Sequence, residues 1–189
     1  IINFQTKKSE KKWMSLMKKL NLNLSSLIII IFFYISFSYS DENNTIKGKA
    51  IVVDGDTIKI KGKQIRFGGI DAPESYYRGK KQTCIDDNKK VFCGQISKDK
   101  LIEKIGNNSL NCKIQKKKDR YKRLVGECFL KDESLSVFMV RNGYAFDWPY
   151  YSEGKFANDQ EYAKMNSLGF WNMKFEYPWE WKKKFRAKK

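Results

Sequence analysis

Three short segments between residues 46 and 67 constrain the fold of this chain more than any other feature. They run over 46–53, 57–61 and 64–67, and apolar residues alternate with polar ones in the second and third. The turn residues Asp-Gly-Asp and Gly-Lys separate them, which is typical of short antiparallel hairpins. This pattern predicts a three-stranded meander with Arg66 on the solvent face. The predicted inner face comprises Ile58, Ile60, Ile65 and Phe67.

The rest of the chain alternates strands and helices without an internal repeat. Apolar spacing predicts helices over 94–105, 134–142 and 158–168, each followed by Gly, and a two-stranded hairpin between residues 110 and 130. Five strands with so few crossovers do not suit a doubly wound sheet. We therefore predict an α+β fold, mainly β, in which a small closed barrel packs about three helices on its outside.

The N-terminal region has the features of an export signal. Residues 1–16 begin with no Met and fit no targeting pattern, so we expect them to be a non-native extension upstream of a true start at Met17. Residues 17–40 combine a basic start with the apolar run 27–35, which is shorter than the ~20 residues of a membrane-spanning helix. We expect cleavage near Ser40 and a periplasmic or secreted product, with a retained anchor as the alternative.

Beyond the signal we divide the chain into three parts. Residues 41–45 form a linker, 46–172 form the globular domain, and 173–189 form an aromatic and basic tail. The basic end of that tail is expected to be a flexible extension.

Four Cys occur in the exported part, and an oxidising compartment allows them to pair. Cys112 and Cys128 are equidistant from the turn at residue 120, so they should face each other across the predicted hairpin. The remaining pair, Cys84–Cys93, closes a small loop. Free thiols remain an alternative, whereas a Cys-only zinc site is disfavoured because no C-x-x-C pair is present.

Charge and composition narrow the possible functions. The formal charge is +17, of which +12 lies beyond residue 40, because residues 1–40 hold six Lys and one Glu. This favours a polyanionic partner such as nucleic acid, although excess Lys also serves solubility. The chain has no His, which excludes His-dependent triads and His-ligated zinc. A metal held by oxygen ligands alone would be a hard cation such as calcium or magnesium.

Four carboxylates and one guanidinium occur within 21 residues. Asp54 and Asp56 lie in the first turn, and Asp71 and Glu74 lie just after Arg66. Each has an ordinary structural interpretation, because Asp is common in turns and Arg is common on strand faces. Together, in a cationic chain without His, they predict a metal and phosphate site.

These residues carry a resemblance to a known family. Asp54-Gly55-Asp56-Thr57, Arg66 with Asp71-Ala72-Pro73-Glu74, Asp119-Arg120-Tyr121-Lys122-Arg123 and Val140-Arg141-Asn142-Gly143 occur in this order. From about residue 46 to 171 the chain resembles the thermonuclease, or staphylococcal nuclease-like, family. The resemblance implies an OB-fold, a five-stranded Greek-key barrel.

It also implies a calcium-dependent phosphodiesterase that cleaves DNA and RNA with little sequence specificity and leaves 3′-phosphates. By position, Asp56, Asp71 and the backbone carbonyl of Ala72 match the calcium ligands, with Asp54 nearby. The implied catalytic residues are Arg66, Glu74 and Arg123. The implied substrate contacts are Arg120 and Tyr121, and more loosely Tyr150 and Tyr151.

One departure from the family pattern bears on activity. Lys122 stands where the family commonly has Gly, and a turn with positive φ at this position would strain Lys and move Arg123. The alternative function is therefore a non-catalytic OB-fold module that binds nucleic acid. A basic structural protein of the cell envelope is a more remote alternative. We expect a monomer.

Overall fold

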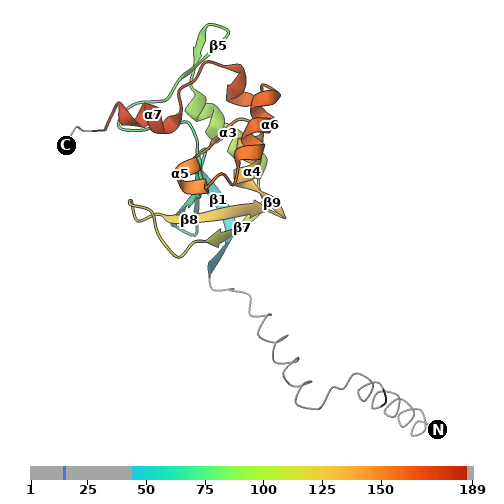
Figure 1. The fold of residues 1–189 in the computed structure, drawn as a ribbon. Helices are drawn as coiled ribbons and strands as arrows, with labels where there is room; N and C mark the ends of the chain where they lie inside the picture. Colours follow the sequence, from blue (N-terminus) through green and yellow to red (C-terminus); the bar gives the residue numbers. More distant parts are fainter. Residues whose placement is uncertain (1–14, 16–43, 187–189) are drawn as a thin grey trace. The chain divides into compact units, whose positions relative to one another are not determined.

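Five strands form a sheet that closes on itself, as the alternation and the turns predict. The computed structural model of the chain describes Ser15 and residues 44–186 (Figure 1). The barrel strands are β1 (Thr45–Asp54), β2 (Thr57–Ile60), β3 (Lys63–Phe67), β7 (Ser109–Ile114) and β8 (Leu124–Leu130).

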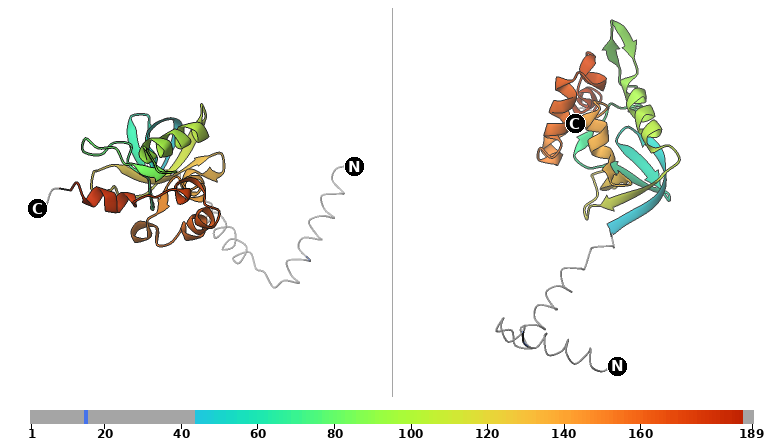
Figure 2. Two further views of the ribbon diagram at one scale, coloured as in Figure 1. Left: turned by 90° about the horizontal axis from the view of Figure 1, so that it is seen from above. Right: turned by 90° about the vertical axis from the view of Figure 1, so that its right-hand side faces the viewer.

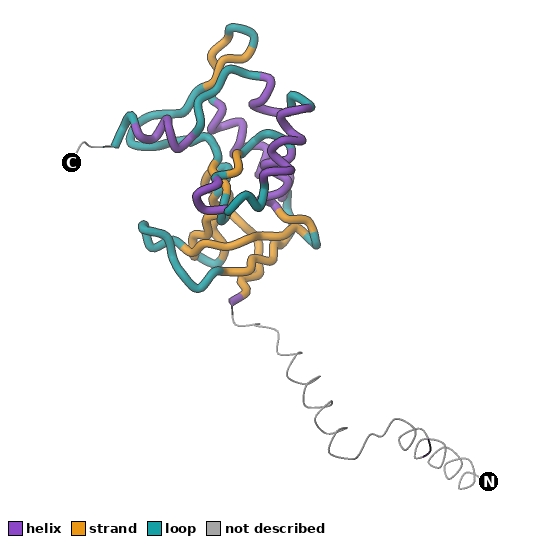
Figure 3. Tube along the Cα trace, in the orientation of Figure 1, coloured by secondary structure: helices purple, strands orange, loops and turns teal. Residues whose placement is uncertain are grey.

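The closure of the barrel depends on one parallel pairing. β1 pairs antiparallel with β2 and β7, β2 with β3, and β7 with β8. β3 then pairs with β8 in parallel, with Ile65 opposite Leu124. The barrel strands gather in one half of the described fold and most of the helices in the other (Figure 3). The predicted α+β OB-fold barrel is confirmed.

The barrel interior is filled by the predicted inner face of the meander. The side chains of Ile58, Ile60, Ile65 and Phe67 are all fully buried. Burial of one such side chain contributes about 1.5–3 kcal/mol to folding, so this alternating set is a large part of what holds β2 and β3 in register. Arg66, between two inward residues, points to the opposite face.

Short strands outside the barrel position its loops. β4 (Ile70–Asp71) pairs with β10 (Phe146–Asp147), and β9 (Glu133–Ser134) extends the sheet beside β8. β5 (Cys84–Asp86) and β6 (Lys89–Val91) form a separate hairpin. This hairpin lies on the far side of helix α3 from the barrel (Figure 1 and the right view of Figure 2).

The three predicted helices are present, and further helical segments lie near them. The predicted ones are α3 (Cys93–Ile105), α4 (Leu135–Arg141) and α6 (Ala157–Met165). The additional ones are α5 (Pro149–Ser152), the 3₁₀ turn η2 (Gly169–Asn172) and α7 (Pro178–Lys183). Their apolar positions are too few for a periodic pattern, because each spans less than two turns.

Both predicted disulfides are present. Cys112 lies directly opposite Cys128 in the β7–β8 register and is bonded to it. Cys84 at the start of β5 is bonded to Cys93 at the start of α3. The second bond ties the hairpin to the helix that packs behind the candidate site.

The aromatic part of the C-terminal tail packs on the domain, and the expectation of a flexible basic end is wrong at its first residue, because Lys182 is buried. Phe146 of β10 stacks on Phe175 with ring centroids 4.7 Å apart and meets Tyr177 edge-on at 5.1 Å. Trp179 of α7 stacks on Trp148 at 5.8 Å. Burial of these aromatic rings favours packing more than hydration of the Lys side chains opposes it. Residues 173–183 therefore pack on the domain.

The predicted upstream extension, signal peptide and most of the linker lie outside the described residues. Among the helices of the described part, none combines the length and apolar character that crossing a bilayer requires.

Candidate active site

A pocket of about 690 Å³ opens between the meander, the β7–β8 loop and the tail. Eight of the sequence-predicted site residues line it: Asp54, Asp56, Arg66, Glu74, Arg120, Tyr121, Arg123 and Tyr151. Asp71 and Ala72 are buried beside it, with 0% and 2% of their surfaces exposed. Tyr150 does not line it and is 81% exposed. The structure therefore gathers most of the predicted set around one cavity.

Local packing fixes the turn that carries Asp54 and Asp56. A Cβ on Gly55 would lie 1.9 Å from the hydroxyl of Ser97 and 2.9 Å from the Cβ of Ala72. Only glycine therefore allows the turn to pack this closely against α3 and the following loop. As a result Asp56 is 97% buried, next to the segment that holds Asp71.

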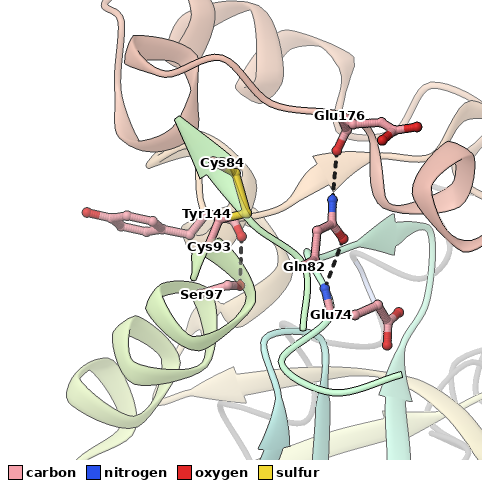
Figure 4. The surroundings of a disulfide bond; sticks show 7 residues. All are labelled: Glu74, Gln82, Cys84, Cys93, Ser97, Tyr144 and Glu176. Atoms are coloured by element: carbon pink, nitrogen blue, oxygen red, sulfur yellow. Dashed lines mark hydrogen bonds between the residues drawn. A yellow bond between two sulfur atoms is a disulfide. The ribbon is translucent and has the colours of Figure 1, made fainter. Parts of the chain in front are cut away.

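Helix α3 supports Glu74 from behind. A Cβ on Gly94, in the first turn of the helix, would lie 2.0 Å from the backbone oxygen of Glu74. The hydroxyl of Ser97 donates a 2.7 Å hydrogen bond to the backbone oxygen of Tyr144, which holds the helix against the segment before β10 (Figure 4).

Arg66 joins the two buried aspartates. Its Nη1 lies 2.6 Å from Oδ2 of Asp56, and its Nη2 lies 2.6 Å from Oδ1 of Asp71. The prediction of a solvent-face side chain is wrong, because only 13% of the side chain is exposed. Alternation identified the correct face of β3, but the loop through β4 covers that face. The two carboxylates raise the pKa of Arg66 against the opposing effect of burial, so it stays charged.

Asp56 is held by further hydrogen bonds. Its Oδ1 accepts from the hydroxyl of Thr57 at 2.7 Å, and its Oδ2 accepts from the backbone N–H of Ala72 at 3.2 Å. Burial alone would raise the pKa of Asp56, but the charges of Arg66 and Lys182 lower it overall. Asp56 is thus a preformed anion. The hydrogen bond from Ala72 also holds this residue, whose backbone carbonyl is a predicted calcium ligand, next to Asp56.

Asp54 has the opposite electrostatic balance. Its Oδ1 accepts hydrogen bonds from the N–H groups of Gly55 at 2.9 Å and Ser75 at 3.2 Å. Burial, together with the charges of Asp56 and Glu74, nevertheless raises its pKa to about 7. Near neutral pH, Asp54 therefore holds a proton for about half of the time in the metal-free protein.

Glu74 is bound by a residue that sequence reasoning missed. Its Oε1 lies 2.6 Å from Nζ of Lys182 in α7, and that ammonium is also 2.8 Å from Oδ1 of Asp71. Burial raises the pKa of Glu74 although Lys182 opposes the shift. The only sequence signal for Lys182 was its place in the basic run 182–184, where nothing distinguishes it from its neighbours.

Gln82 was also missed, and it holds the backbone of Glu74. Its Oε1 accepts from the N–H of Glu74 at 3.1 Å, while its Nε2 donates to the backbone oxygen of Glu176 in the tail at 2.8 Å. Figure 4 shows this bridge beside the Cys84–Cys93 disulfide. A single uncharged Gln in a loop gives no pattern that could have indicated the bridge.

Arg123 lines the pocket but is bound to Asp119. Its Nε lies 2.7 Å from Oδ2 of Asp119, and the same Asp accepts the N–H groups of Tyr121 and Arg123 through Oδ1, both at 2.9 Å. Lys122 has φ of 63°, so the turn does need the left-handed conformation. Lys adopts it at a cost of about 1–2 kcal/mol, and Arg123 still faces the pocket.

Aromatic side chains lie at the rim of the pocket. Tyr121 is 58% exposed, and the guanidinium carbons of Arg120 and Arg123 lie 4.9 Å and 5.3 Å from its ring centroid. Tyr151 meets Trp148 edge-on at 4.5 Å. Exposed rings beside guanidinium groups can stack on unpaired bases.

Comparison with known proteins shows the family of this chain. The sequence model described as "Staphylococcal nuclease homologue" matches residues 64–173 of the chain. The chain belongs to the staphylococcal nuclease homologue family. The match begins in β3 and ends just after η2, so it includes Arg66, Asp71, Glu74 and Arg123.

Relatives of this nuclease family differ in length and in name. The chain is 33% identical over 133 residues to the succinoglycan biosynthesis protein ExoI of Rhizobium meliloti, covering 69% of this chain and 66% of that protein. It is 32% identical over 161 residues to endonuclease YhcR of Bacillus subtilis, covering 72% and 12%. It is 29% identical over 154 residues to an uncharacterized endonuclease of Haemophilus influenzae, covering 78% and 76%. The chain thus spans under two thirds of the length of the first two of these relatives.

The donor atoms of the candidate site have the chemistry that a hard divalent cation prefers. All of the carboxylate donors are oxygens, and Oδ2 of Asp71 is buried without a hydrogen-bond partner. Within the described residues, no group of three or more Asp, Glu or Cys is arranged to hold a metal. Instead, Arg66 pairs with Asp56 and Asp71, and Lys182 pairs with Asp71 and Glu74.

Proposed function

We propose that this protein is a calcium-dependent phosphodiesterase that hydrolyses DNA and RNA with little sequence specificity and leaves 3′-phosphates. The observation that carries the proposal is the convergence of Arg66, Glu74 and Arg123 on one pocket, which Asp56 also lines and beside which Asp71 is buried. Family membership supports the same activity.

Calcium would be held by Asp56, Asp71 and the carbonyl of Ala72, near Asp54. Its positive charge would stabilise the negative charge that develops on the phosphate oxygens. The guanidiniums of Arg66 and Arg123 stabilise the same negative charge, because a planar guanidinium binds two phosphate oxygens at once and keeps its proton. In the structure both are bound to carboxylates of the chain. An entering phosphodiester replaces those carboxylates with its own oxygens.

Glu74 orients the attacking water or accepts its proton. Burial raises its pKa, which makes it a better proton acceptor than an exposed Glu at neutral pH. Gln82 fixes the backbone of Glu74, so the carboxylate can turn toward the water while its main chain stays in place.

The pocket surface supports a nucleic-acid substrate without base readout. Lys117, Lys118, Arg120 and Arg186 add positive charge around the rim, and Tyr121 offers a face for stacking. Stacking and phosphate contacts accept any base, which gives low sequence specificity.

We further propose that the protein is exported to the periplasm or secreted and acts as a monomer without a lasting membrane anchor. The two disulfides support an oxidising compartment. All of the groups in the proposed mechanism come from one chain, which supports a monomeric unit.

The experiment compares cleavage of single-stranded DNA and of RNA by the purified, oxidised protein in calcium and in a calcium chelator. Glu74→Gln and Arg123→Ala are each expected to reduce the rate by about 10²–10³. Arg141→Ala is the matched control, because Arg141 pairs with Asp159 outside the pocket. Products that become extendable only after treatment with a 3′-phosphatase would identify the phosphate end.

Failure to cleave either substrate in calcium, with the protein folded, would sink the enzyme proposal. Salt-sensitive binding without cleavage would then support the nucleic-acid-binding module, which the occupation of Glu74 by Lys182 favours as the second candidate.

A further inference from the structure

Helix α7 brings a Lys side chain onto two residues of the proposed catalytic machinery. Lys182 lies 111 residues beyond Asp71 and 108 beyond Glu74, and its ammonium contacts both. Its side chain is 11% exposed, and that of Asp71 is fully buried. Although burial lowers the pKa of Lys182, the charges of Asp71 and Glu74 raise it overall, so the group is a cation. The pocket therefore contains a cation supplied by the chain itself.

Contacts other than those of Lys182 hold α7 in place. Trp181 packs edge-on against Tyr77 at 6.3 Å, and Arg78 donates a 2.9 Å hydrogen bond to the backbone oxygen of Phe185. The bridge through Gln82 ties the segment before α7 to the backbone of Glu74 (Figure 4). The helix is therefore docked partly by packing and partly by the contacts of Lys182 with the two carboxylates.

The ammonium and a divalent cation both need the carboxylate of Asp71. Oδ1 of Asp71 already accepts from both Arg66 and Lys182, and Oε1 of Glu74 accepts from Lys182. A divalent cation bound to Asp71 would lie within a few ångströms of the ammonium, in a buried site where repulsion between like charges is poorly screened. The two cations therefore exclude each other.

We propose that Lys182 is a tethered competitor of the divalent cation, so that α7 sets the cation concentration at which the site loads. Cation binding displaces the ammonium from Asp71 and Glu74 and loosens α7. By linkage, the docked helix weakens cation binding by the same factor as the cation weakens docking. This inference rests on the proposed function, because it takes the site to bind calcium.

The test measures calcium affinity of the full chain by isothermal titration calorimetry. Lys182→Met keeps the aliphatic stem but removes the competing charge, and it is expected to lower the dissociation constant for calcium by about 10-fold or more, a coupling of ordinary size. Lys183→Met is the matched control. It removes the same charge from the next residue, whose side chain is 60% exposed and pairs with Glu180, and it should change the dissociation constant by less than about 3-fold.

A second measurement on the unaltered protein covers the case in which Lys182→Met does not fold. Hydrogen exchange of residues 178–183 should become faster when calcium is added, because the helix loses its contact with Asp71. Unchanged or slower exchange would overturn the proposal, and so would equal or weaker calcium binding by Lys182→Met.

Cleavage assayed on the same preparations separates this inference from the proposed function. Calcium-dependent cleavage, together with equal calcium affinity in the unaltered protein, Lys182→Met and Lys183→Met, would overturn the proposed competition by Lys182. The proposed nuclease activity would be unaffected by that result. Absence of both calcium binding and cleavage would overturn both.

Discussion

Asp54 makes the stability of the metal-free protein depend on pH in an unusual direction. Its pKa is about 7 in the folded protein and 3.8 in a solvated chain. Between these values the folded state keeps a proton that the unfolded state loses, so the free energy of unfolding falls as pH rises. Above pH 7 the stability that depends on this proton is completely lost, and below about pH 4 none of it is lost.

Asp54→Asn removes this dependence and leaves the local hydrogen bonds in place. The amide oxygen of Asn can still accept from the N–H groups of Gly55 and Ser75, which contact Asp54 now. A shift of about three pKa units corresponds to about 4 kcal/mol at most. Because Glu74 adjusts its own protonation as well, we expect the variant to gain about 2–4 kcal/mol over the unaltered protein at pH 8 and little at pH 4.

Urea unfolding with a chelator present, at pH values from 4 to 8 and with the disulfides intact, measures this gain. Other titrating groups occur in both proteins and largely cancel in the difference. Asp132→Asn, in the exposed turn before β9, is the control and should show no gain. A difference between Asp54→Asn and the unaltered protein that stays within about 0.5 kcal/mol over this range would refute the reasoning.

Three further changes test the scaffold of the site. Lys122→Gly should stabilise the protein by up to about 1 kcal/mol, because Gly relieves the left-handed strain at φ 63°; a lower melting temperature would contradict this. Gly94→Ala should slow cleavage by about 10-fold or more with secondary structure retained, because its Cβ would displace Glu74; circular dichroism and single-turnover rates measure both effects, and an unchanged rate would refute the role. Replacing Cys112 and Cys128 by Ala should cost about 2–4 kcal/mol in urea unfolding, since their bond closes a 16-residue separation; an unchanged midpoint would contradict that.

The barrel could be predicted because its signals are local. Alternation placed Ile58, Ile60, Ile65 and Phe67 inside, and the spacing about residue 120 placed Cys112 opposite Cys128. Each of these relations joins neighbouring strands, where a turn fixes the register.

The contents of the pocket were less predictable because they depend on distant segments. Alternation gave the face of Arg66 but not the loop that covers it. Lys182 reaches Glu74 from 108 residues away, and its position is decided by the packing of Trp181 and Phe185 rather than by any pattern around it. A basic run predicts charge in general, and only tertiary packing selects Lys182 as the one buried Lys within residues 44–186.

The parallel pairing of β3 with β8 also determines at which stage of synthesis and folding the candidate site can form. Arg66 lies beside Ile65, and Arg123 precedes Leu124, which pairs with Ile65. The two guanidiniums therefore flank a contact that closes a loop of about 60 residues, and closing so long a loop is slow relative to forming a hairpin. During synthesis, the meander can form as soon as it emerges, whereas the proposed phosphate-binding pair comes together only after β8 has been made and docked. The proposed site is thus incomplete until the barrel has closed.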